Sequence, residues 1–160
     1  GAHDWPAVLA QLGGGRMNEF PPLDGIPAWP DVEDLMCTYL DRFGHTCTET
    51  PPAQDASGAP LFESLLPVIV IERSGGGTPN GAIDVAMIHI SVTGSTRSGS
   101  WAVMNGGVRR AVAAAENGAF IDGYTIVGMS EEVGPQMIPG LNPDTRTVQL
   151  AFQVVVQRPR

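Results

Sequence analysis

The stretch IDVAMIHISVTGSTRSGSWAVMNGGVRRAVAAA, residues 83–115, carries a strand, a polar turn and a helix in direct succession. Residues 83–93 hold three isoleucines, two valines and a threonine without proline or glycine, a composition typical of a β-strand. Residues 95–100 are short and polar, which predicts a loop that supplies helix caps. From Trp101 onward apolar residues recur at spacings of three and four, which predicts an amphipathic helix that ends before Gly118. We expect this helix to lie flat on one face of a sheet.

Similar signals along the rest of the chain predict one more helix and three more strands. An amphipathic helix is expected to begin at Asp31, a good N-cap residue, and to end at Gly44. Apolar runs predict strands at residues 68–73, 124–129 and 147–157. The last of these runs alternates along its length, so one of its faces should be buried and the other should face water or a partner.

Together these elements predict an α+β fold, in which a mainly antiparallel four-stranded sheet carries two main helices on one face. Residues 74–81 and 130–145 are rich in glycine or proline and are expected to be loops. Residues 1–30 are expected to form a loop-rich N-terminal extension, and residues 31–160 a single domain.

Charge is distributed unevenly along the chain. It contains nine arginines and no lysine, and its net charge is −8. Residues 1–58 hold nine acids and two arginines, whereas residues 59–160 hold eight acids and seven arginines. A chain this acidic lacks the basic surface that binds nucleic acid, although DNA can slide past an acidic wall without sticking to it. No apolar run reaches the length of a membrane span, so we expect no membrane association.

The sequence offers little catalytic chemistry, and we expect neither an enzyme nor a cofactor. His89 lies in a predicted strand two residues before Ser91, and Asp84 or Asp122 could complete a Ser/His/Asp set. No Gly-x-Ser-x-Gly elbow accompanies these residues. We therefore expect His89 to be a strand residue held in place by packing or hydrogen bonding.

Metal-binding chemistry is also sparse. Cys37 and Cys47 lie ten residues apart and could form a disulfide or, with His45, half of a metal site. The interpretation that we favour is one thiol buried on a helix and one loop thiol. The acids among residues 31–34 could also hold a metal, but acids in a first helical turn usually cap the helix and complement its dipole. We expect no metal centre.

Residues 1–30 contain apolar anchors that a disordered tail would lack. Trp5, Phe20 and Trp29 are large side chains on a segment whose prolines favour an extended path. We expect this segment to dock on a neighbouring subunit or on a partner protein.

Three arginines form a second expected interface. Arg97 lies in the predicted loop before the helix, and Arg109 and Arg110 lie on the helix outside its apolar stripe. We expect them to contact acidic residues of an adjacent copy. The alternative is that they are solvated helix charges that contribute little to stability.

Four segments occur in a characteristic order. They are PDVEDLMCTYL at residues 30–40, LFESLLPVIVIERSGG at 61–76, IDVAMIHISVTGSTRSGSWAVMNGGVRRAV at 83–112 and TVQLAFQVVVQRP at 147–159. In order and spacing, they resemble the tail terminator proteins of long-tailed bacteriophages, in the form found in phages of actinobacteria. The resemblance covers residues 31–160 and leaves residues 1–30 outside it.

This resemblance implies a structural virion protein without a catalytic site, located in the tail at the neck and assembled in the host cytoplasm. Such proteins form a hexameric ring on the finished tail tube, stop its polymerisation and provide the surface that joins the filled head. The implied partners are further copies of the chain, the tail tube protein and a head-completion or connector protein. DNA would pass through the lumen without specific binding.

A ring needs two different patches on each subunit that meet each other. The acidic first third and the more arginine-rich remainder could supply these patches. Two alternatives stay open from the sequence. One is another neck or head-completion connector protein, and the other is a small hydrolase that uses His89 and a serine.

Overall fold

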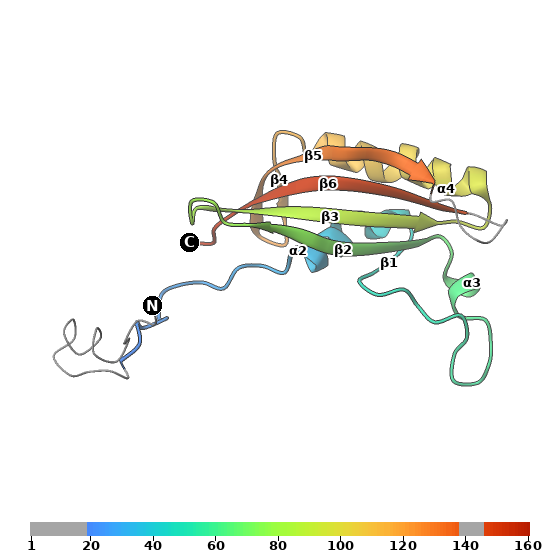
Figure 1. Cartoon of the computed structure of the whole chain (residues 1–160), viewed down its shortest axis with the longest axis horizontal. Helices are drawn as coiled ribbons and strands as arrows, with labels where there is room; N and C mark the ends of the chain where they lie inside the picture. The colour runs from blue at the N-terminus through green and yellow to red at the C-terminus, as the bar shows by residue number, and fades with distance from the viewer. Residues whose placement is uncertain (1–18, 138–145) are drawn as a thin grey trace, which may run out of the picture.

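The computed structural model describes residues 19–137 and 146–160, and in these ranges it shows a mixed sheet with helices on one face (Figure 1). The order of strands across the sheet is β1-β2-β3-β6-β5-β4, and neighbours are antiparallel except for the parallel pair of β1 and β2. The strands are β1 (His45–Cys47), β2 (Val68–Gly77), β3 (Ile83–Thr93), β4 (Ala119–Ile121), β5 (Tyr124–Met137) and β6 (Thr147–Gln157). The helices are α2 (Val32–Leu40), α3 (Phe62–Leu65), α4 (Arg97–Val103) and α5 (Arg109–Ala114).

The predicted α+β class is confirmed, but the prediction of four strands is wrong at the sheet edges. β1 and β4 are three-residue edge strands, and the parallel pairing of β1 makes the sheet mixed. β2 continues to Gly77 and β5 continues to Met137, through segments that were expected to be loops. Neighbouring strands supply backbone partners to these segments: Gly76 pairs with Ala86, and Gln136 pairs with Gln149. Backbone pairing of this kind does not depend on the side chains that signal a strand in a sequence.

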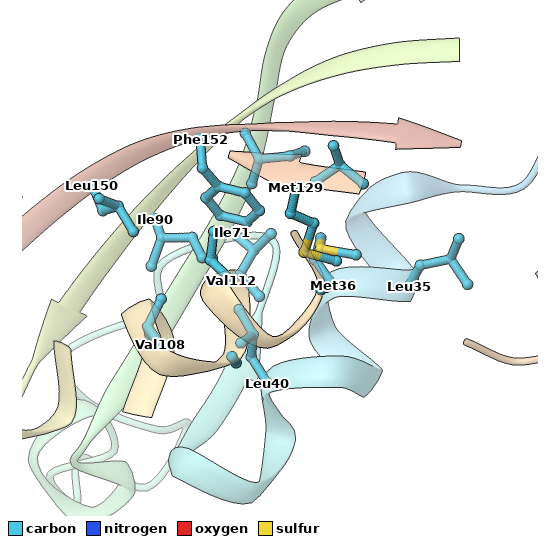
Figure 2. Packing of buried hydrophobic residues seen from close by; sticks show 14 of the residues in the cluster. Leu35, Met36, Leu40, Ile71, Ile90, Val108, Val112, Met129, Leu150 and Phe152 are labelled. Atoms are coloured by element: carbon cyan, nitrogen blue, oxygen red, sulfur yellow. The ribbon is translucent and has the colours of Figure 1, made fainter. Parts of the chain in front are cut away.

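The buried face of the sheet is the one covered by the helices. In β6 the alternating residues Val148, Leu150, Phe152, Val154 and Val156 are all buried, as the alternation predicted. Figure 2 shows Phe152 pointing toward the helix layer, where Val112 of α5 and Met36 of α2 lie. One hydrophobic core therefore joins β6 to both helices.

Both helix starts are set by capping side chains. The Asp31 carboxylate accepts a hydrogen bond from the Asp34 amide at 3.2 Å, and α2 begins where it was predicted to begin. The second helix begins earlier than predicted, because the Thr96 hydroxyl accepts a hydrogen bond from the Gly99 amide at 3.0 Å. Arg97 is consequently in the first turn of α4, and its expected place in a loop is wrong.

A π-helical turn, Met104–Val108, joins α4 to α5, so the helix passes through its two glycines without a break. A Cβ atom at Gly107 would lie 2.8 Å from a ring carbon of Phe43, so the glycine allows a close approach to the end of α2. The Tyr39 hydroxyl of α2 donates to the Ala111 carbonyl of α5 at 2.6 Å. These contacts hold the two helices together.

Arg73 links β3 to β2 through its side chain and the start of α2 to β2 through its backbone amide. Two guanidinium nitrogens of Arg73 donate to the two carboxylate oxygens of Asp84 at 2.8 and 2.7 Å. The hydrogen bonds that Arg73 donates to Asp84 also raise the pKa of Arg73. The backbone amide of Arg73 donates to the Glu33 carboxylate in the first turn of α2 at 2.9 Å. β2, β3 and α2 are therefore linked at the point where residues 19–30 join the domain.

Candidate functional site

The sheet face opposite the helices carries partly exposed side chains, most of them uncharged. Val70, Val85, Met87, Ser91, Gln149 and Gln153 are half-buried on it. Glu72 and His89 are exposed on it. The side chains on this face are accessible to solvent or to another molecule, as expected for the outer side of the last strand.

His89 lies in β3, as predicted, but its side chain is exposed, so the expectation that packing would hold it is wrong. It borders a shallow hollow of about 350 Å³ that Glu72, Ser91 and Gln149 also line. The Gln149 amide donates to the Ser91 hydroxyl at 3.1 Å. Asp84 is buried on the opposite face of the same strand and paired with Arg73, so it cannot complete a Ser/His/Asp set with His89.

The two cysteines are free thiols on neighbouring elements. Burial raises the pKa of Cys37 to about 11, and it also raises the pKa of Cys47. The Cys47 thiol donates to the Ile69 carbonyl at 3.7 Å, and the Thr46 hydroxyl donates to the Cys37 carbonyl at 3.2 Å. The Cys47 thiol and the Cys37 backbone are each held by a local hydrogen bond, and Cys47 lies in β1 and not in the loop where it was expected.

The acidic start of α2 is used structurally, since Asp31 caps the helix and Glu33 accepts from the backbone of β2. Across residues 19–137 and 146–160, no three His, Cys, Asp or Glu side chains gather as a metal site would require. In the same part of the chain, no helix combines the length and the apolar character needed to cross a bilayer.

The three arginines singled out from the sequence differ in their environments. Arg109 donates to both carboxylate oxygens of Glu131 on β5, at 2.5 and 3.1 Å, and this contact raises the pKa of Arg109. Arg110 is exposed and donates to the Gly106 carbonyl at 3.4 Å. Arg97 is exposed in the first turn of α4. Contact of these arginines with an adjacent copy stays a prediction, and Arg109 already has a carboxylate partner in its own chain.

Residues 19–30, here called the arm, run from the start of α2 away from the sheet and helices (Figure 1). Phe20 is 83% exposed and Trp29 is 37% exposed, so the domain leaves both anchors accessible. Trp5, the third predicted anchor, lies outside the described residues. Docking of the arm on another subunit stays a prediction.

A groove of about 430 Å³ lies between α5 and β5 and is here called the α5–β5 groove. Its floor is apolar, because the buried side chains Val112 and Met129 line it. Its rim is polar and contains Asn105, Arg109, Arg110, Glu116 and Glu131. An apolar centre with a polar rim is the usual arrangement of a surface that binds another protein.

Comparison with known proteins places the chain in a family. A family model described as phage tail termination protein matches residues 28–160, which include every helix and strand described above. The chain belongs to the phage tail termination protein family. As a member of this family it has a structural role in the phage tail and is a component of the virion. A comparison with curated proteins gave no match.

The family match confirms the resemblance to tail terminator proteins. The sequence did not predict the α5–β5 groove. Its lining comes from residues 105–116 and 129–131, which are separate in the sequence and meet only because β5 lies beside α5. Arg109 and Arg110 were its only sequence signal, as charges outside an apolar stripe. Nothing in that stripe indicates that a cavity opens beneath them.

Proposed function

We propose that this protein ends polymerisation of the tail tube by closing its growing end as a homo-oligomeric ring. The observation that supports this most directly is the family match over residues 28–160, which spans the whole unit of sheet and helices. The expected number of six copies comes from the resemblance to tail terminator proteins. The surface left free after capping would join the tail to a head-completion or connector protein.

A ring requires each subunit to present two different surfaces, one to each neighbour. The arm leaves the domain at the start of α2, which packs mainly on β1 and β2, whereas the α5–β5 groove lies against β5, nearer the other edge of the sheet. We therefore assign the subunit interface to these two sides. The residues proposed for it are Trp5, Phe20, Trp29, Arg97, Arg109 and Arg110.

The charge of the chain supports passage of DNA through such a ring without specific binding. A net charge of −8 per copy repels phosphate instead of condensing on it. The tail tube protein is the proposed partner on one side of the ring and the connector protein on the other. Assembly is proposed to take place in the host cytoplasm.

The test is assembly of tail tubes with and without this protein, with tube lengths measured by electron microscopy. With the protein, tubes should reach one length and carry a ring at one end, and end-on views should show sixfold symmetry. Without it, tubes should grow past that length. As a control, protein added late should stop growth at the length reached at that moment. Equal length distributions in both reactions would contradict the proposed function.

A further inference from the structure

We propose that the arm of one copy lies in the α5–β5 groove of the next copy, with Asp24 of the arm paired to Arg110 of the groove. This inference rests on the proposed ring and specifies which two surfaces meet in it.

The arm concentrates exposed apolar side chains. Its large apolar residues recur at every third position, and their exposed fractions are 83% for Phe20, 78% for Leu23, 53% for Ile26 and 37% for Trp29. Elsewhere in the described ranges, the large hydrophobic residues exposed by more than a third are Phe120, Val127 and Val133. Exposed apolar residues gathered in one short segment indicate a surface that binds another protein.

The arm also has a defined shape before it binds. The Ile26 amide donates to the Leu23 carbonyl at 3.1 Å, and Gly25 has a φ of 79°, which together form a β-turn. This turn brings the side chains of Leu23 and Ile26 to neighbouring positions. Four prolines within residues 21–30 restrict the remaining backbone, so docking costs less conformational entropy.

The charges of the two surfaces match at one point and fix a direction. The arm contains two acids, Glu19 and Asp24, and no arginine, and Asp24 is the acid that lies within the run of apolar side chains from Phe20 to Trp29. Arg110 is exposed on the groove rim and, within the described part of the chain, has no carboxylate partner, whereas Arg109 is held by Glu131. Glu116 lies just past the end of α5, six residues after Arg110, so it disfavours an acidic residue at that end of the groove. Asp24 therefore fits the end at Arg110.

The positions of arm and groove favour contact between copies. The arm starts from α2, whose sheet contacts are mainly with β1 and β2 and less with β4, and the groove lies against β5. β2 and β5 are each second from an edge of the sheet, on opposite sides. Figure 1 shows the arm leaving the domain on the side away from α5 and β5. A contact between opposite sides of successive subunits is the kind that propagates around a ring.

The test is a disulfide between copies, formed in the full-length variant that carries both Asp24→Cys and Arg110→Cys. After oxidation, a non-reducing gel should show a ladder of covalent multimers, and mass photometry of the largest species gives the number of copies. The matched control places the second cysteine at Phe120, which is 77% exposed on β4 and does not line the groove, in the variant Asp24→Cys with Phe120→Cys. Wild-type protein controls for its own two cysteines. The proposal would be overturned if the variant gave no larger covalent products than the control variant and the wild type. It would also be overturned if the two cysteines linked within one chain and left a monomer.

A second pair of variants separates this proposal from the ring itself. The arm variant Phe20→Ser with Leu23→Ser and the groove variant Arg110→Glu should each be folded by circular dichroism and fail to form rings on tails. Mixed together they should form one-to-one dimers, because the mixture retains one intact arm and one intact groove. The control Phe120→Ser changes an equally large residue, 77% exposed on β4, and should still form rings.

The outcomes assign failure to one proposal or the other. If wild type and both variants form the same ring, the contact between arm and groove is wrong and the ring stands. If wild-type protein forms no ring on tails, the proposed function is wrong. In that case, a ladder in the cysteine variant would still show the contact as an open chain of copies.

Discussion

Removal of the charge of Asp84 should destabilise the domain, because its ion pair with Arg73 lies where the arm joins the domain. In the variant Asp84→Asn the side chain keeps its size, but Arg73 loses its ionic partner. Each of the two charge-assisted hydrogen bonds, at 2.8 and 2.7 Å, is expected to contribute about 1.5–3 kcal/mol. The carboxylate is 8% exposed and therefore desolvated, whereas the guanidinium is 31% exposed and regains water when its partner is removed. The asparagine can still accept one hydrogen bond. We therefore expect a loss of about 2–3 kcal/mol in the free energy of unfolding.

The assay is urea unfolding at neutral pH, followed by circular dichroism, with the slope of the free energy against urea checked for a two-state transition. The variant Arg73→Gln and the double variant complete a double-mutant cycle. The double variant should be more stable than the sum of the two single losses by about 1–2 kcal/mol, since the two side chains are in direct contact. Glu131→Gln is the matched control, because it breaks the more exposed pair with Arg109 and should cost less than about 1 kcal/mol. A loss below about 0.5 kcal/mol for Asp84→Asn, or an additive cycle, would refute the reasoning.

Three further outcomes follow from individual contacts. Gly107→Ala should lower the free energy of unfolding by about 1–3 kcal/mol, since its Cβ would lie 2.8 Å from the Phe43 ring, and Phe43→Leu should relieve part of this loss in urea unfolding. Tyr39→Phe should cost about 1 kcal/mol in the same assay, because the Ala111 carbonyl loses the hydroxyl that donates to it at 2.6 Å. Burial raises the pKa of Cys37 to about 11, so the folded state retains this proton above the pH at which the unfolded chain loses it. The resulting stability is fully present below about pH 8.5 and is lost toward pH 11. The decline over this range should be shallower in Cys37→Ser, and an equal decline in both proteins would contradict the assignment.

The regular part of the fold could be predicted because local pattern and tertiary burial agree there. The alternation of residues 147–157 identified the buried face of β6, and Asp31 marked the start of α2 by its capping chemistry. The sheet edges could not be predicted in this way. Gly76 carries no strand signal, and it becomes part of β2 only because β3 provides the backbone partner.

Of the two candidate surfaces, the arm could be predicted from the sequence and the groove could not. Phe20 and Trp29 could be identified from the sequence, because large apolar residues among prolines are out of place in a solvated tail. The groove could not be identified, since Val112 and Met129 read as ordinary core residues and only the tertiary structure leaves space above them. Nothing in the sequence was a reason to treat the three arginines differently. Only the structure shows that Arg109 is paired with a carboxylate of its own chain, whereas Arg110 donates to a backbone carbonyl.

What the sequence by itself determined is the identity of the main helices and central strands, their order and the family, because periodicity, caps and segment spacing are local and additive along the chain. What only the tertiary structure decided is which residues face each other across elements. Gly107 in the π-helical turn lies against Phe43, a residue of a distant segment. Asp84 is sequestered from His89 because successive residues of a strand point to opposite faces and Arg73 of the next strand holds the carboxylate. Such contacts depend on how the elements pack and on the register between strands, and the pattern within a single element shows neither.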